Sequence, residues 1–153
     1  MVSSGEVDLI AMTMTKLVAK FDRSIRPRRK NVTIGSLAQL KRMLLSLKGR
    51  KNDPVIFLEN EAGDGLTVAV MDPYATIVFR PADRNGPSMS PTTARKIKDW
   101  NQYASSELIE FRFGGVPSPV PVDWCISIRK MIAVVVHFYR TGKRLKSVKW
   151  RVN

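Results

Sequence analysis

The stretch that decides the fold runs from residue 114 to residue 150 and reads GGVPSPVPVDWCISIRKMIAVVVHFYRTGKRLKSVKW. Its first part is punctuated by Pro117, Pro119 and Pro121. Because proline fixes φ and has no N–H group, this segment favours an extended arm over a helix or a central strand. We therefore expect regular structure to resume after Pro121.

The second part of this stretch predicts a helix followed by a strand. Ser127 is a suitable N-cap, and apolar residues then recur every three or four positions, as on one face of a helix: Ile128, Met131, Ile132, Val135 and Phe138. Gly142 follows as a left-handed C-cap, and the basic residues around it suit the negative end of the helix dipole. We expect the helix over 127–140 and a strand over 147–152, with Val148 and Trp150 on one face.

This stretch resembles the C-terminal signature of the first immunity-protein family of bacterial polymorphic toxin systems. In that family a helix closes with an aromatic residue and T-G-x-R-P, and a strand then ends in tryptophan. The matching residues here, including the arm, are Gly114, Pro117, Phe138, Thr141, Gly142, Arg144, Val148 and Trp150. The chain departs from the pattern at Leu145, where proline is usual, and at His137, where an acid is often found. The resemblance covers about residues 31–150.

Length and composition indicate one globular domain over residues 1–153. We expect a strand and a basic segment in 1–30, and the resemblance implies an immunity-like core in 31–153. The chain is 44% hydrophobic, and it has no apolar run near the ~18 residues that span a bilayer. We expect no secretory signal, no membrane partner and a cytoplasmic location. Cys125, the single cysteine, is interpreted as a small apolar residue rather than a reactive thiol.

The charge balance is strongly basic. Twenty-six Lys and Arg stand against thirteen Asp and Glu, a formal net charge of +13, which predicts attraction to polyanions or to an acidic protein surface. The basic residues fall into four clusters, within 23–30, 41–51, 95–98 and 140–151. The alternative is that they are solvated charges of loops and helix ends.

The rest of the chain supplies a helix and several strands. Leu37, Leu40, Met43, Leu44 and Leu47 predict an amphipathic helix that Ser36 caps and Gly49 ends. After it, 55–59, 66–71 and 75–80 predict a three-stranded antiparallel meander. We expect a strand within 7–21, although a helix also fits its pattern, and a linker from there up to residue 30. We also expect an irregular connection over 81–100 and a fourth strand over 107–113.

These elements predict an α+β fold in which an antiparallel sheet of about five or six strands carries the 36–48 and 127–140 helices on one face. The expected core residues are Leu40, Leu44, Phe57, Val68, Val70, Val78, Phe111, Met131, Val135, Phe138 and Trp150.

No pattern of residues in the sequence indicates catalysis, a metal or a cofactor. The only histidine, His137, falls among valines and aromatics in a helix, where a structural role is the more frequent one. Glu59, Glu61 and Asp64 surround a glycine turn but lack the spacing of a calcium loop, so we interpret them as a hairpin tip.

Two functions remain open. The resemblance implies an antitoxin that binds and occludes a cognate toxin domain, often a nucleic-acid deaminase or nuclease. The basic composition favours a small nucleic-acid-binding module, but no helix-turn-helix or aromatic stacking strand accompanies it. We favour the antitoxin and expect the toxin to contact the least regular exposed segments, through Glu59, Glu61, Asp64, Arg84, Arg95, Lys96 and Lys98.

Overall fold

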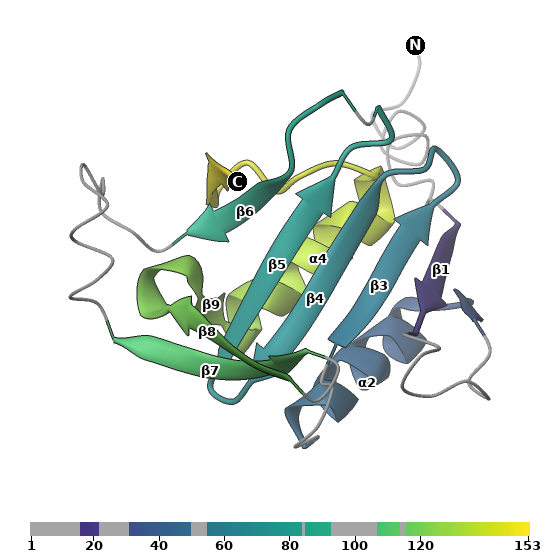
Figure 1. Cartoon of the computed structure of the whole chain (residues 1–153). Coiled ribbons are helices and arrows are strands. Elements are labelled where there is room, and N and C mark those ends of the chain that lie inside the picture. Colours follow the sequence, from purple (N-terminus) through teal and green to yellow (C-terminus); the bar gives the residue numbers. More distant parts are fainter. Residues whose placement is uncertain (1–15, 22–30, 50–54, 84, 93–106, 114–115) are drawn as a thin grey trace, which may run out of the picture.

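The computed structural model describes residues 16–21, 31–49, 55–83, 85–92, 107–113 and 116–153 (Figure 1). In chain order its elements are β1 (Leu17–Lys20), β2 (Val32–Ile34), α2 (Leu37–Lys48), β3 (Val55–Asn60), β4 (Gly65–Met71), β5 (Tyr74–Arg80), β6 (Met89–Thr92), β7 (Leu108–Phe113), β8 (Val116–Pro121), the 3-10 helix η1 (Val122–Trp124), β9 (Ile126–Ser127), α4 (Ile128–Thr141) and β10 (Lys149–Val152). Neither of the two α-helices in these ranges is long and apolar enough to cross a membrane.

An antiparallel sheet of eight strands forms the middle layer of the fold (Figure 1). Its order is β10-β6-β5-β4-β3-β1-β2, and β9 pairs with the start of β5. β3, β4 and β5 are the predicted meander. β1 lies between β3 and β2 and buries Leu17 and Ala19, so the core begins before the predicted boundary at residue 31. The rest of the strand predicted within 7–21 falls mainly outside the described residues.

The α+β class is confirmed, and the sheet is larger than five or six strands. The irregular connection predicted over 81–100 contains β6, which pairs with β10 along four residues and sets Pro91 opposite Trp150. A four-residue strand that contains a proline carries no periodic signal, so only its tertiary pairing reveals it. β2 and β9 are shorter still.

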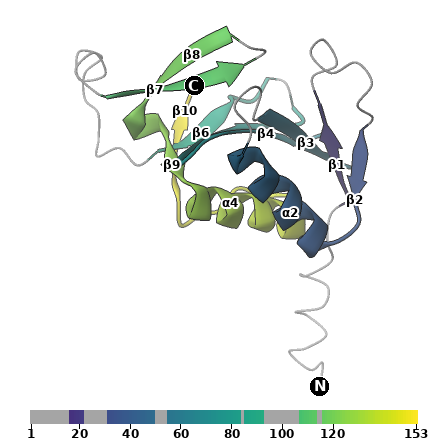
Figure 2. The ribbon, with the colours of Figure 1, turned by 90° about the horizontal axis from the view of Figure 1, so that it is seen from below.

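The two helices lie on the same face of the sheet (Figure 2). The predicted N-caps are confirmed: the Ser36 hydroxyl accepts from the Gln39 N–H and the Ser127 hydroxyl from the Lys130 N–H, each at 3.1 Å. Gly142 ends α4 at a φ of 71°, in the left-handed region that glycine adopts without strain, and its N–H donates to the Phe138 carbonyl at 2.7 Å.

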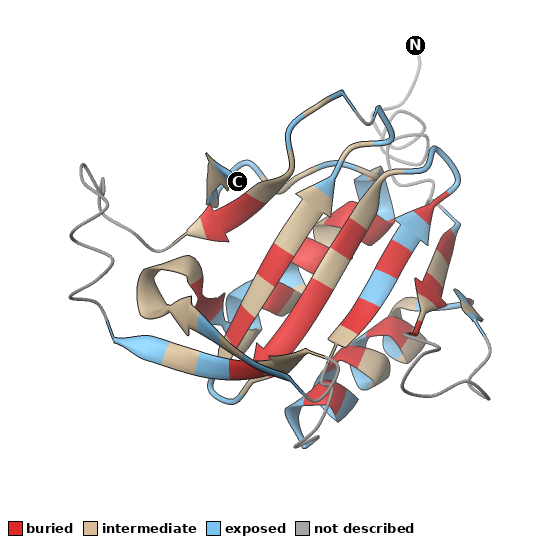
Figure 3. Ribbon diagram, in the orientation of Figure 1, coloured by how far each residue is buried: buried red, intermediate tan, exposed pale blue. Residues whose placement is uncertain are grey.

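The main core fills the space between helices and sheet, and Figure 3 shows the alternation of buried and exposed residues along the strands. Of the predicted core, these residues are buried there: Leu40, Leu44, Val68, Val70, Met131, Val135 and Phe138. Phe57, by contrast, is 37% exposed, and Val78 and Trp150 are only half-buried. Phe57 and Val78 lie in register with Thr67 on the face away from the helices, because alternate side chains of a strand point to opposite faces.

A separate two-stranded sheet, β7 with β8, packs on that second face (Figure 2). The prediction that 107–113 joins the main sheet is therefore wrong, and Phe111 is buried in a second cluster with Ala69 and Cys125. The proline arm itself is a strand. Its prolines occupy alternate positions, so the N–H groups they lack all belong to one side of β8, which leaves the other side free to pair with β7.

Candidate functional site

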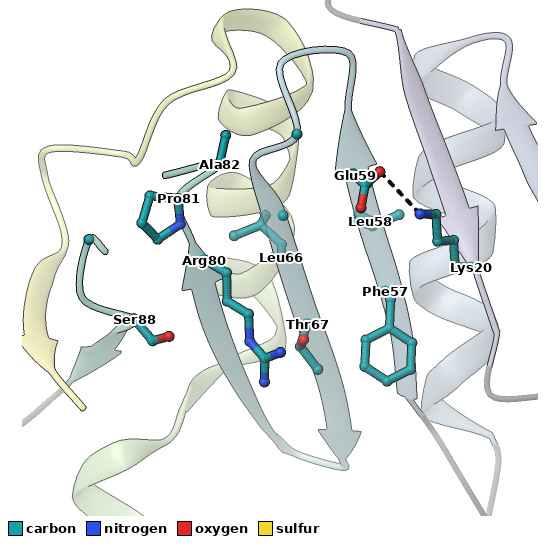
Figure 4. A pocket seen from close by; sticks show the side chains of 13 residues that line it. Lys20, Phe57, Leu58, Glu59, Leu66, Thr67, Arg80, Pro81, Ala82 and Ser88 are labelled. Carbon is teal, nitrogen blue, oxygen red and sulfur yellow. Dashed lines mark ion pairs between the residues drawn. The ribbon is translucent and has the colours of Figure 1, made fainter. Parts of the chain in front are cut away.

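The part of the second sheet face that lies away from the β7–β8 cluster contains a depression of 510 Å³ (Figure 4). Residues of β1, β3, β4 and β5 and of the connection after β5 line it. We call it the open sheet face and define it by the side chains of Lys20, Phe57, Glu59, Thr67 and Arg80.

Strand register explains why these side chains share one face. Lys20 pairs with Phe57, which pairs with Thr67, and side chains directly opposite each other point to the same side. One row further along, Glu59 and Arg80 both pair with Gly65. Because Gly65 has no side chain, the surface of the sheet is recessed at β4, between the long charged side chains of Glu59 and Arg80.

One ion pair orders the rim of the depression. Lys20 Nζ lies 3.1 Å from Glu59 Oε1, and both side chains are about half exposed. An exposed pair of this kind contributes about 0 to 1 kcal/mol to stability, so its main effect is to hold two opposite charges beside Phe57. The surface therefore presents an apolar ring bordered by charges of both signs.

An acidic cluster stands at the end of the sheet where β3 turns into β4 and β5 ends. The Asp64 carboxylate accepts from the Ala82 N–H at 2.7 Å and so fastens the segment after β5 to the hairpin turn. The buried Asn60 side chain accepts from the Asp64 N–H at 3.0 Å and fixes the turn from within. We call the acids of these two segments the hairpin-tip cluster: Glu59, Glu61, Asp64 and Asp83.

The predicted contact residues divide into two groups. Glu59, Glu61 and Asp64 come together at the hairpin tip, and Glu59 also borders the depression. Arg84, Arg95, Lys96 and Lys98 lie outside the described residues. Asp83 and Arg80 are neighbours of the hairpin that were not predicted from the sequence, and Phe57, which was predicted in the core, lies on this exposed surface. The alternation of β3 could have placed Phe57 with Glu59 on the second face, since the two are separated by one residue.

The residues that carry the sequence resemblance, where they fall within the described ranges, hold the C-terminal segment together. The Trp150 and Phe138 rings each meet the Phe79 ring edge-on, at centroid distances of 6.4 and 6.2 Å. The Arg144 guanidinium lies 5.6 Å from the Phe79 ring centroid and 5.7 Å from that of Trp150. The Trp150 indole N–H also donates to the Leu145 carbonyl at 2.9 Å.

Thr141 and Pro117 complete this set. The Thr141 hydroxyl donates to the His137 carbonyl at 2.8 Å and accepts from the Lys143 N–H at 3.1 Å, so it closes the end of α4 beside Gly142. Pro117 lies in β8 opposite Arg112. Gly114 is outside the described residues. The contacts of these residues indicate a structural role.

Two titratable groups among the described residues have a shifted pKa. Burial lowers the pKa of His137 below its ordinary 6.5. Burial, together with the nearby Asp123 carboxylate, raises the pKa of the Cys125 thiol to about 11, and its Sγ lies 3.6 Å from the Pro121 carbonyl oxygen. In the described part of the chain, no group of three or more His, Cys, Asp or Glu side chains is placed to hold a metal ion.

Comparisons with known proteins do not assign the chain to a family. A scan against protein-family models finds no match. A search of curated proteins finds no relative.

Proposed function

We propose that this protein is an immunity protein, an antitoxin that binds a cognate bacterial toxin domain and covers its active site. The class comes from the resemblance of the C-terminal stretch. The observation that carries the proposal in this fold is the open sheet face with the hairpin-tip cluster at its edge. Such a surface suits recognition of another protein, which needs rigid complementarity rather than reactive groups.

Charge distribution supports a nucleic-acid-cleaving or nucleic-acid-deaminating toxin as the partner. Enzymes of this kind tend to have basic clefts, and a +13 protein would be repelled by one unless its contact surface were locally acidic. Four of the eight acids in the described ranges belong to the hairpin-tip cluster, and the other four are Asp72, Glu107, Glu110 and Asp123. The hairpin tip is thus the part of this surface best suited to approach a basic cleft.

The open sheet face provides anchors next to these acids. Aromatic and arginine side chains contribute most of the binding energy in many interfaces, and here Phe57 and Arg80 are both exposed beside the depression. Phe57 extends from β3 and Arg80 from β5, on either side of β4, so the backbone that carries these anchors is already ordered before a partner covers them.

Co-expression with the toxin domain encoded by the adjacent reading frame tests the proposal. We expect the chain to protect cells from that domain and to co-elute with it as a complex. Association rates are then compared at two salt concentrations for wild type and for a Glu59→Gln, Glu61→Gln, Asp83→Asn variant. These changes remove three charges but keep acceptor oxygens, and they leave the Asp64 link to Ala82 intact.

A matched variant controls for net charge. Asp72→Asn, Glu107→Gln, Glu110→Gln also removes three exposed carboxylates, away from the hairpin tip. For a basic toxin, the first variant should associate more slowly and with weaker salt dependence than the control. If the toxin is acidic, reversing Arg95, Lys96 and Lys98 should slow association instead. Absence of any complex with the adjacent-gene product would reject the proposal.

A further inference from the structure

The outer surface of the two helices carries only positive charge. α2 and α4 together contain six basic residues and no acidic one: Lys41, Arg42, Lys48, Arg129, Lys130 and Arg140. All six are exposed. The buried stripes of the helices face the sheet (Figure 2), and these six side chains lie outside those stripes, with Lys48 at the end of α2 directed toward Asp72 of the β4–β5 turn. We call this surface the basic helix layer.

Within the described residues the charges of this layer are hardly neutralised. Lys48 lies 4.0 Å from Asp72, at the limit of an ion pair, and no described carboxylate comes that close to the other five. A surface that exists only to be soluble usually mixes both signs. Here one sign persists over helices of 12 and 14 residues, about 18 and 21 Å long.

Two of these cations stand where they weaken the helix that carries them. Arg129 and Lys130 occupy the first turn of α4, where the helix dipole is positive and an acidic residue is favoured. Lys130 is also the third residue after the Ser127 cap, the position at which glutamate would complete a capping box. Lysine at this position therefore lowers the stability of α4. An anionic partner bound at this end of the helix would offset that unfavourable charge interaction.

We propose that the basic helix layer binds the phosphate backbone of nucleic acid. An acidic protein would require an interface with an apolar or aromatic centre, and the layer does not offer one. The aromatic residues of α4, Phe138 and Tyr139, are buried, and Leu45 is the exposed large apolar residue of the two helices. A surface with exposed Lys and Arg side chains but no exposed aromatic rings fits a partner that is recognised by its phosphate charge and not by base stacking or base contacts.

The dimensions of the layer define a small footprint. Arg129 and Arg140 are separated by about 16 Å along the axis of α4, which corresponds to about five base pairs of a duplex. Five or six cations over this length predict that log Kd changes with log salt with a slope near 5 in magnitude, at about 0.9 per phosphate contact. Binding should be independent of sequence.

Fluorescence anisotropy with a labelled mixed-sequence DNA duplex tests the proposal. Wild type should bind with a Kd on the order of micromolar or tighter at about 50 mM salt. Lys41→Ala, Arg42→Ala, Lys130→Ala together should weaken binding by about tenfold or more and lower the salt slope by about 3. The control removes three exposed cations outside the helices, Lys16→Ala, Lys146→Ala, Lys149→Ala, and should have a much smaller effect.

Lys130→Glu separates binding from folding. Completion of the capping box should raise the melting temperature by about 2 to 4 °C while nucleic-acid binding weakens, so lost binding could not be attributed to misfolding. Equal losses in helix and control variants, or no binding at about 50 mM salt, would overturn the proposal. Equally tight, helix-dependent binding of polyglutamate would also overturn it, in favour of an acidic polypeptide. Because toxin protection is not measured, failure here leaves the immunity proposal intact.

Discussion

Replacement of Trp150 by alanine tests whether the C-terminal motif is architectural. A large aromatic side chain buries roughly 150 to 250 Å² when fully covered, and the half-buried indole therefore contributes about 2.5 kcal/mol at ~25 cal/mol per Å². Its N–H bond to the Leu145 carbonyl adds about 1 kcal/mol. We expect Trp150→Ala to lower the free energy of unfolding by about 3 to 4 kcal/mol and Trp150→Phe by about 1 to 2 kcal/mol.

Urea denaturation measures this loss as a shift of the midpoint at constant slope. Val152→Ala, in the same strand, is the control: its side chain is 62% exposed and its loss should cost under about 0.5 kcal/mol. A double-mutant cycle of Trp150→Ala with Arg144→Met, which keeps the arginine stem, should give a coupling of about 0.5 to 1 kcal/mol for the cation and the ring. If Trp150→Ala is no worse than Val152→Ala, the motif is not structural and its residues become candidates for partner contact.

Three further outcomes follow from individual residues. Gly142→Ala forces a residue with a side chain into the left-handed region and should lower the free energy of unfolding by about 1 kcal/mol. Gly49→Ala, at a φ of −87°, should not, and thermal melts of both variants measure the difference. Cys125 should react with a thiol reagent at pH 8 only after denaturant is added, because its pKa is about 11 and it is buried; rapid labelling of the native protein would contradict this. Because the pKa of His137 is below 6.5 in the folded state, the unfolded chain takes up the proton first, and the free energy of unfolding should fall as pH drops below 6.5. His137→Gln should flatten this pH dependence, and an unchanged profile would assign the dependence to other groups.

The helices could be predicted from the sequence because their signals are local. Ser36, Ser127 and Gly142 specify where each helix begins or ends through their own backbone and hydroxyl groups. The three- and four-residue spacing of leucines and valines then specifies the buried face. No distant part of the chain is needed for either inference.

The sheet was harder to predict because its arrangement depends on residues far apart in sequence. β6 pairs with β10, some 60 residues later, and the residues of Met89–Thr92 contain no local pattern that predicts this pairing. Similarly, Phe57 and Phe111 have the same hydrophobicity, yet Phe57 is exposed and Phe111 is buried against Ala69 and Cys125, since only the position of the second sheet decides which part of a face is covered. Candidate contact residues follow the same rule: the segment that contains Asp83 reaches the hairpin tip because Arg80 pairs with Gly65 and the Asp64 carboxylate accepts from the Ala82 N–H.

Net charge alone would predict a protein that avoids every basic partner, but this fold separates its charges in space. The hairpin-tip cluster collects acids from two turns at one end of the sheet, while the basic helix layer covers the face opposite the open sheet face. Exposed charges farther apart than a Debye length, about 8 Å at physiological salt, are largely screened from one another. A basic toxin and a nucleic acid can therefore each meet a surface of opposite sign, and substitutions in one surface should leave binding at the other nearly unchanged.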